Sequence, residues 1–360
     1  MPDLSGMPCW FLGANAPKGY FSRFDQLFSS SPEGRCFLLK GGPGTGKSTV
    51  LKKIAAVLKE KDPRTELIFC SADTDSLDAV ITSDGAVSAA DATLPHAVEP
   101  KYPGTYETVI NLSDCWNEKV LREHAKEISV LFDTNRHLHE EARRYISAAA
   151  NLLEEASKIG MESLYPEKTE KAALRLCLKE FGRKKQIKGT EKQRFLSAIT
   201  GKGVFFFEET PKLLCKRIYM LDDEPGAFSR VFLNVVRRTA LEYGLDIITC
   251  RCPVFPLEKI EHIFIPELEL GFVTGNKRHR IKIVPYRTIH SRRFTDPEIF
   301  MKNKMRMKFA LRQAANILDE AVLCLDEAKR KHDELEKFYI PAMDFSKVNE
   351  RLKSIILEIK

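Results

Sequence analysis

The stretch Gly41-Gly42-Pro43-Gly44-Thr45-Gly46-Lys47-Ser48 decides the fold of this chain. It fits the pattern G-x-x-x-x-G-K-[ST]. A short apolar run at residues 36–39 precedes it, and residues 48–58 after it are apolar at helical spacing. Between a strand and a helix, such glycines let backbone N–H groups point at a phosphate, and the helix adds its positive end. The stretch therefore predicts a strand, a phosphate-binding loop and a helix in that order.

Lys47 and Ser48 end this glycine-rich loop and carry its chemistry. Lys47 supplies a mobile positive charge to the β- and γ-phosphates of a nucleotide, and the Ser48 hydroxyl is a ligand for Mg²⁺. The sequence therefore predicts ATP and Mg²⁺ as ligands. The residues expected to bind the nucleotide are Gly41, Gly42, Pro43, Gly44, Thr45, Gly46, Lys47, Ser48 and Thr49.

Hydrolysis also requires an acid that holds the metal ion through water, and two residues compete for this role. Asp91 closes the strand expected over residues 85–90, whereas Asp73 follows a more apolar stretch at residues 67–72. We favour Asp91 as the metal-binding and catalytic acid, acting with Lys47, and keep Asp73 as the alternative. A capping or loop role for both acids is the other interpretation.

Short polar residues crowd the segment 71–78, which includes Asp73 and Asp75. The segment follows a strand end, where α/β sheets bind ligands, so these two acids are candidate accessory residues. An Asx turn and a cap before a helix explain the segment equally well. His96 follows Asp91 by five residues and could sense the γ-phosphate or orient water, although a lone loop histidine is more often incidental.

Apolar runs of strand length alternate with helical patterns in the first 100 residues. Strands are expected at residues 36–39, 66–70 and 85–90, with a helix between the first two. This alternation predicts an α/β fold with a mainly parallel sheet.

The composition is that of an ordinary folded protein, and 360 residues are enough for two domains. With 43% hydrophobic and 30% charged residues, a disordered chain is excluded. The nine cysteines contain no Cys-x-x-Cys pair, which argues against a disulfide framework or a zinc ribbon. Since no run of 18 apolar residues and no secretory signal occurs, we expect a cytoplasmic protein without a membrane partner.

The two halves of the chain resemble each other. Apolar residues at three-four spacing over residues 117–159 and 307–339 predict a long helix in each half, and the strings at 148–156 and 313–321 agree. We expect the helices to pair into a stalk or bundle that reports the nucleotide state.

Matches outside the helices extend this internal repeat. The matching segments are residues 37–44 with 219–226 and residues 10–18 with 204–212. We therefore expect a first repeat at residues 1–200, with the intact loop and a helical extension, and a degenerate second repeat at residues 201–360 with long C-terminal helices.

The second repeat lacks a working glycine-rich loop. In an ungapped comparison, Phe228 replaces the last glycine and Ser229 replaces the lysine, and the acids at residues 222–224 would repel a triphosphate. The position that matches Asp91 is Thr274 or nearby. We expect this repeat to be a nucleotide-free partner of the first.

Two basic tracts concentrate the net charge of +7. They are interpreted as a nucleic-acid footprint, as the source of an arginine that completes the nucleotide site, or as solvated basic faces. We favour solvated faces, because few aromatic residues lie between the charges. The tracts are Arg183, Lys184, Lys185, Lys188, Lys192 and Arg194, and Lys277, Arg278, Arg280, Lys282, Arg287, Arg292 and Arg293, followed by Lys302, Lys304, Arg306 and Lys308.

The loop at residues 41–49 resembles that of P-loop NTPases of the RecA and AAA type. More narrowly, nearly the whole chain resembles a bacterial family of two-repeat P-loop ATPases or ATP-binding proteins. The matched segments are residues 11–19, 73–78, 91–96 and 100–104. The resemblance implies ATP binding at Lys47 and Ser48 and a strand-end acidic role for Asp91. In such families the second half often keeps its own loop, and here it does not.

These features predict a Mg²⁺-dependent ATP-binding protein, an ATPase with one competent site in the first repeat. One alternative is a P-loop kinase for a small molecule or nucleotide, in which residues 73–78 hold the acceptor. Another is a nucleotide-gated scaffold that binds nucleic acid through the basic second half. Whether the further partner is a small molecule or a protein is left open.

Overall fold

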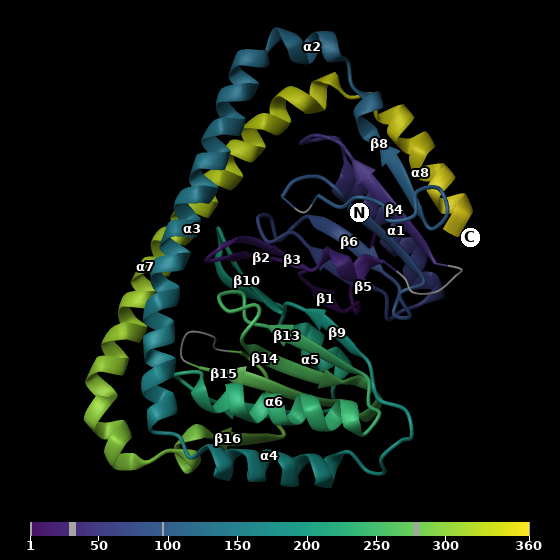
Figure 1. The fold of residues 1–360 in the computed structure, drawn as a ribbon. Helices are drawn as coiled ribbons and strands as arrows, with labels where there is room; N and C mark the ends of the chain where they lie inside the picture. Colours follow the sequence, from purple (N-terminus) through teal and green to yellow (C-terminus); the bar gives the residue numbers. More distant parts are fainter. Residues whose placement is uncertain (1, 29–33, 96, 277–280, 360) are drawn as a thin grey trace.

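Two α/β domains, each built on a six-stranded sheet, are joined by a pair of long helices (Figure 1). The computed structural model describes residues 2–28, 34–95, 97–276 and 281–359. Most neighbouring strands in both sheets are parallel, so the predicted α/β class is confirmed.

The strands of the first sheet are β1 (Cys9–Trp10), β4 (Arg35–Lys40), β5 (Glu66–Phe69), β6 (Leu77–Ile81), β7 (Val87–Asp91) and β8 (Glu107–Asn111). They lie in the order β1-β5-β6-β7-β4-β8. Every neighbouring pair is parallel except the two that involve β6. The three strands predicted from the sequence are β4, β5 and β7, so their existence is confirmed.

The sequence does not predict strand β6. The polar segment before it forms a turn in which the Ser76 N–H donates to the Asp73 carbonyl, and the chain then enters the strand. The interpretation of this segment as the cap of a helix is therefore wrong. All five residues of β6 are buried, so the strand shows none of the polar alternation that marks a strand with one solvated face.

Helix α1 (Lys47–Lys61) covers the outer face of the first sheet, where Val50, Ile54 and Leu58 are buried. The inner face contributes Leu38 and Ile68 to an apolar cluster that also holds residues of the second sheet. The two domains thus share one hydrophobic cluster between their facing sheets, and each has a further core of its own.

The second sheet consists of β9 (Glu191–Arg194), β12 (Arg217–Asp222), β13 (Ile247–Arg251), β14 (Ile260–Ile265), β15 (Leu270–Gly275) and β16 (Arg287–His290). Its order, β9-β13-β14-β15-β12-β16, repeats that of the first sheet strand for strand, with the same two antiparallel pairs. Helix α6 (Ala227–Glu242) takes the place of α1. The expected internal repeat is confirmed at the level of architecture.

A short hairpin follows the first strand of each repeat. The hairpins are β2 (Gly13–Ala16) with β3 (Gly19–Ser22), and β10 (Ser197–Thr200) with β11 (Gly203–Phe206). Just before them, Phe11 and Phe195 exchange two backbone hydrogen bonds of 2.9 Å. Phe195 is therefore the counterpart of Phe11, and the predicted match of residues 10–18 with 204–212 is wrong. The expected boundary at residue 200 falls inside the β10–β11 hairpin, whereas the second sheet already begins with β9.

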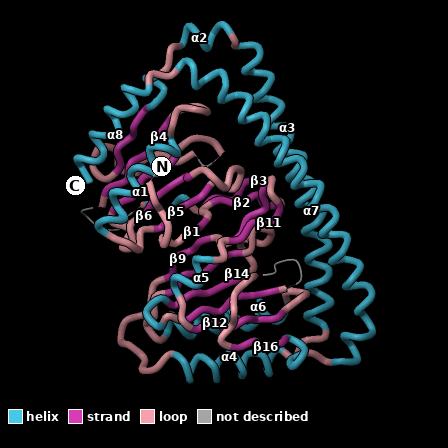
Figure 2. Tube along the Cα trace, turned by 180° about the vertical axis from the view of Figure 1, so that it is seen from behind, coloured by secondary structure: helices cyan, strands magenta, loops and turns pink. Residues whose placement is uncertain are grey.

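Two long helices, α3 (Ala125–Glu162) and α7 (Pro297–Tyr339), run side by side in opposite directions along both domains (Figures 1 and 2). A short helix, α2 (Glu118–Glu123), precedes α3, so the helix expected over residues 117–159 is interrupted at His124. The predicted pairing of the helices is confirmed. No described helix is both long enough and apolar enough to cross a membrane.

The chain exchanges its last helices between the domains. Helix α4 (Pro166–Glu180) ends the first half of the chain but packs against α6 of the second domain. Helix α8 (Phe345–Ile359) ends the second half and packs against α1 of the first domain. Each α/β unit is therefore completed by the other half of the sequence.

The bridges at the two ends of the helical pair give the register of the repeat. Trp116 pairs with Met343, and Leu164 pairs with Thr295. In this twofold arrangement Trp116 is equivalent to Thr295 and Leu164 to Met343, a spacing of 179 residues in both cases. The matched strings at 148–156 and 313–321 are 165 residues apart, so that alignment is wrong by 14 residues, or two heptads. A heptad pattern matches itself at every multiple of seven, which explains the error.

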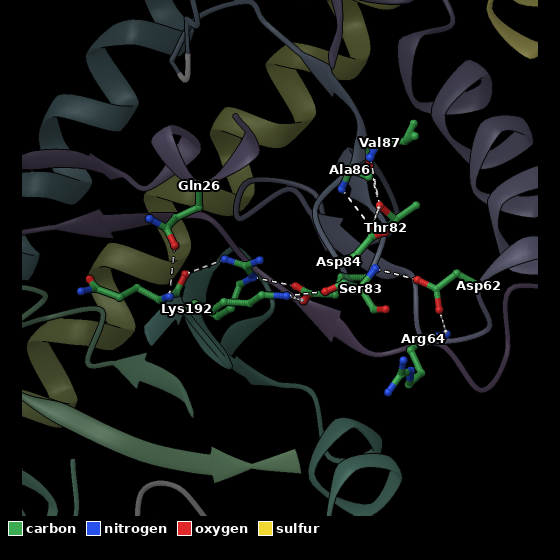
Figure 3. A network of polar contacts seen from close by, with 12 residues as sticks. Gln26, Asp62, Arg64, Thr82, Ser83, Asp84, Ala86, Val87 and Lys192 are labelled. Atoms are coloured by element: carbon green, nitrogen blue, oxygen red, sulfur yellow. Dashed lines mark hydrogen bonds and ion pairs between the residues drawn. The ribbon is translucent and has the colours of Figure 1, made fainter. Parts of the chain in front are cut away.

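Part of the first basic tract forms the polar contact between the domains. Arg194 is 2% exposed, and its Nε lies 2.6 Å from a carboxylate oxygen of Glu66. Lys192 lies 3.8 Å from Glu66 and donates to the carbonyl of Ser83, in the network shown in Figure 3. These two residues link the domains, whereas the other basic residues of the tract are exposed, as the favoured interpretation of a solvated face expects: Arg183, Lys184, Lys185 and Lys188. In the second tract, residues 277–280 lie outside the described residues.

Candidate functional site

The glycine-rich loop connects β4 to α1 as the sequence predicts. Gly44 and Gly46 have φ angles of +65° and +86°, a region that residues with a side chain rarely adopt. Gly46 is the N-cap of α1, and Lys47 is the first residue of the helix. The backbone N–H groups at the start of α1 therefore lack helical partners and can bind an anion.

Lys47 folds back over this loop. Its Nζ donates hydrogen bonds to the carbonyl oxygens of Gly41 and Gly42, at 2.8 and 2.7 Å. The same nitrogen lies 3.6 Å from a carboxylate oxygen of Asp91. Both side chains are largely buried, with exposed fractions of 11% for Lys47 and 15% for Asp91. The structure thus brings the predicted lysine and the favoured acid together.

Asp91 is held beside the loop because β7 is the neighbour of β4. Asp91 pairs with Leu39 across the two strands, and its carboxylate accepts a hydrogen bond of 2.9 Å from the Thr93 N–H. Ser48, the other expected metal ligand, accepts a hydrogen bond of 3.0 Å from the Leu77 N–H. Among the described residues no cluster of three His, Cys, Asp or Glu could hold a metal ion. A serine and one carboxylate beside phosphates fit the few protein ligands that Mg²⁺ takes.

Asp73 lies on the loop after β5 and is engaged by its neighbours. It accepts hydrogen bonds from the Asp75 N–H at 3.1 Å and the Ser76 hydroxyl at 2.9 Å, and it lies 3.3 Å from Nζ of Lys329 on α7. Burial opposes ionisation, but the Asp75 N–H, the Lys329 charge and the Ser76 hydroxyl hold the pKa of Asp73 below its ordinary value. Asp73 therefore ties the loop to α7.

Of the two remaining accessory candidates, the structure describes Asp75 and does not bring it to this site. The Asp75 carboxylate is exposed and lies 2.7 Å from Nζ of Lys202 in the second half of the chain. His96 lies outside the described residues.

Asp78 is a site residue that the sequence reasoning missed as a partner of Asp91. Ala79 of β6 pairs with Ala90 of β7, so positions 78 and 91 come next to each other on one face of the sheet. Asp78 is 5% exposed. The pKa of Tyr20 lies well above its ordinary value, first because Tyr20 is buried and then because the charge of Asp78 is near it. Only the pairing of β6 with β7 reveals that these positions are neighbours, and the apolar run after Asp78 was the available signal for β6.

A cavity of about 960 Å³ opens over these residues. Its floor is the glycine-rich loop, all of whose residues from 41 to 49 line it, together with Asp73, Asp78 and Asp91. The β2–β3 hairpin and the long helices form the walls. The lining residues of the helices are Asn135, Arg136, His139, Glu140, Ala142, Arg143 and Ile146 of α3, and Ala328, Lys329, His332 and Glu336 of α7.

The end of α7 packs directly on the glycine-rich loop. A side chain on Gly44 would approach the Ile340 side chain to 3.0 Å and the Glu336 backbone to about 3.4 Å. The pKa of Glu336 is below its ordinary value, first because His332 donates a hydrogen bond to its carboxylate. Burial raises this pKa, but the charges of His332 and Lys329 and the Gly44 N–H lower it further. A carboxylate from the second half of the chain thus faces the loop that is expected to hold phosphate.

The equivalent loop of the second domain is filled from within. Its Gly226 has φ +76° and is the N-cap of α6, so Ala227 stands where Lys47 stands and the loop is two residues shorter. The predicted match, in which Phe228 replaces the last glycine and Ser229 replaces the lysine, is therefore wrong by two positions. The prediction that the second loop lacks the lysine is confirmed, because Ala227 stands at that position.

A buried carboxylate, that of Asp223, occupies the N–H groups of this second loop. It accepts hydrogen bonds from the Gly226 N–H at 3.2 Å and the Ser229 N–H at 2.7 Å. Burial raises the pKa of Asp223, although Ser229 and the nearby charge of Lys259 act in the opposite direction. Thr274 pairs with Leu221 as Asp91 pairs with Leu39, so the predicted match of Thr274 to Asp91 is confirmed.

Comparisons with protein-family models, with curated proteins and with solved structures found no match to this chain. The resemblance to two-repeat ATP-binding proteins stays a prediction, and the two α/β domains that it implies are present.

Proposed function

We propose that the first domain binds ATP with Mg²⁺ and hydrolyses it slowly. The observation that carries this proposal is the loop with left-handed Gly44 and Gly46, whose Lys47 lies 3.6 Å from the strand-end Asp91. A phosphate-binding loop, a mobile lysine and a neighbouring acid are the parts that phosphoryl transfer requires.

The proposed mechanism assigns a role to each of these residues. The N–H groups of the loop hold the phosphates, and Lys47 moves from the Gly41 and Gly42 carbonyls to the β- and γ-phosphates. Ser48 and Asp91 would hold Mg²⁺, which when bound neutralises charge on the phosphate oxygens. A water molecule attacks the γ-phosphorus, its proton passes to Asp78, and the bond to the β–γ bridging oxygen breaks to leave ADP.

The second domain is proposed to be nucleotide-free. The carboxylate of Asp223 already takes the N–H groups that a phosphate would need, and no lysine stands at the position of Ala227. A phosphate entering there would have to displace a buried group that is hydrogen-bonded twice.

The test is a calorimetric titration of the full chain with ATP and Mg²⁺, followed by measurement of phosphate release. We expect one nucleotide per chain and slow turnover. Two nucleotides per chain would contradict the assignment of the second domain, and no binding would overturn the proposal.

A small-molecule kinase is the second candidate, and the size of the cavity favours it. About 960 Å³ is at the upper end of the range for ligand pockets, and the cavity extends from the loop to both long helices. Turnover that stays at background until an acceptor is added would identify the kinase. A nucleic-acid scaffold has less support, because Arg194 and Lys192 are engaged between the domains.

Glu336→Gln is expected to strengthen ATP binding about tenfold, because the neutral amide no longer repels phosphate near the Gly44 N–H. The same titration measures the change. Glu334→Gln is the matched control on α7, since Glu334 pairs with Lys331 at 3.0 Å and lies outside the cavity lining. Unchanged or weaker binding by the Glu336 variant would show that this carboxylate does not compete with phosphate.

A further inference from the structure

The helical wall of the cavity is basic, and its residues belong to α3 and α7 and not to the glycine-rich loop. Arg136, His139 and Arg143 follow one another at spacings of three and four on α3, so they share one face of the helix. Lys329 and His332 on α7 line the same wall. The acidic side chains of the long helices in this lining are Glu140 and Glu336.

Three of the five basic side chains have acidic partners. Arg136 pairs with Asp133 at 3.2 Å on its own helix. Lys329 lies 3.3 Å from Asp73, and His332 lies 3.6 Å from Glu336. The charges of these three are therefore largely compensated.

Arg143 and His139 differ from their neighbours. Within the described part of the chain neither forms an ion pair, although Glu140 lies one turn from Arg143 on the same helix. Burial, followed by the charge of His332, lowers the pKa of His139. Arg143 is exposed and lines the cavity with His139 and His332, and among the described residues its guanidinium has no carboxylate partner, so an anion bound there would gain a charged hydrogen bond.

We propose that Arg143, His139 and His332 form an anion subsite on the helical wall of the cavity, for a phosphate or carboxylate group. The guanidinium of Arg143 is suited to such groups because its fork of N–H donors matches their oxygen atoms. The occupant is the terminal phosphate of the nucleotide or the anionic group of a second substrate. Both occupants rest on the proposed function, because each requires ATP in the cavity, whereas binding of inorganic phosphate to the subsite does not.

The subsite is tested first with inorganic phosphate in a Lys47→Ala background, which removes the charge of the glycine-rich loop. We expect phosphate to stabilise this protein against thermal unfolding. Adding Arg143→Gln should raise the phosphate concentration needed for this stabilisation about tenfold, because one charged hydrogen-bond partner is lost. Adding Arg144→Gln should leave the phosphate affinity unchanged, since Arg144 is exposed like Arg143 but lies outside the cavity lining.

Nucleotide titrations of the single Arg143→Gln variant distinguish the two occupants, the γ-phosphate of ATP and the anionic group of a second substrate. If the γ-phosphate occupies the subsite, ATP binding weakens about tenfold while ADP binding does not. If a second substrate occupies it, both nucleotide affinities persist and phosphate binding to the ADP complex is lost. Equal phosphate and nucleotide binding by the Arg143 and Arg144 variants would overturn the subsite. Absence of nucleotide binding in the unsubstituted protein would overturn only the proposed function, because the phosphate arm needs no nucleotide.

Discussion

Lys47→Ala is expected to weaken ATP binding by about 100-fold or more. The Lys47 ammonium is the one cationic group at the start of α1, and each hydrogen bond that it gives to a charged phosphate contributes roughly 1.5–3 kcal/mol. Two such bonds correspond to at least a 100-fold change in affinity. Calorimetric titration with ATP and Mg²⁺ measures the loss.

Lys53→Ala is the matched control for this substitution. Lys53 lies on the same helix, but its Nζ is exposed and 3.2 Å from the Asn349 side chain on α8. We expect this variant to bind ATP as the unsubstituted protein does. Equal binding by the Lys47 and Lys53 variants would reject the glycine-rich loop as the nucleotide site.

Asp91→Asn is expected to lower ATP turnover by about 100- to 1,000-fold, the size of effect seen when one group that stabilises transition-state charge is removed. Nucleotide binding without Mg²⁺ should persist, because the loop and Lys47 are intact. Phosphate release and binding, each measured with and without Mg²⁺, separate the two effects. The neutral amide keeps the size of the carboxylate that packs beside β4.

Asp73→Asn decides between the two acids that the sequence left in competition. Its carboxylate is taken by the Asp75 N–H, the Ser76 hydroxyl and Lys329, so we expect a much smaller loss of turnover than for Asp91→Asn. If the Asp73 variant loses turnover and the Asp91 variant keeps it, Asp73 is the metal-binding acid and the assignment is reversed.

Local signals in the sequence were sufficient for the first domain's central elements. Strand β4, the glycine-rich loop and α1 follow from one eight-residue motif, because the glycines and the helical spacing restrict the backbone over short distances. The neighbouring position of Asp91 also follows from the strand pattern. Strand β6 was missed because a strand buried on both faces carries no alternation, and with it the proximity of Asp78 to Asp91 was missed.

The internal repeat was detected correctly, but its alignment was not. Conserved spacing in the α/β part indicated two equivalent sheets, whereas the heptad pattern of α3 and α7 allowed a register that is two heptads in error. The bridge between Phe11 and Phe195 corrects the start of the repeat in the same way. Pairing between residues far apart in the chain resolves alignments that short apolar patterns leave degenerate.

By itself, the sequence determined the α/β class, the duplication and the loop with Lys47 and Ser48, because these depend on spacing within a few turns of chain. Only the tertiary structure decided that α4 and α8 are exchanged between the domains, that Asp223 fills the second loop, and that α3 and α7 wall the cavity with Arg143 and Glu336. Such contacts join residues far apart in the chain, and α3 and α7 pair because they bury their apolar seams against each other and against Ile199, Cys252 and Val254.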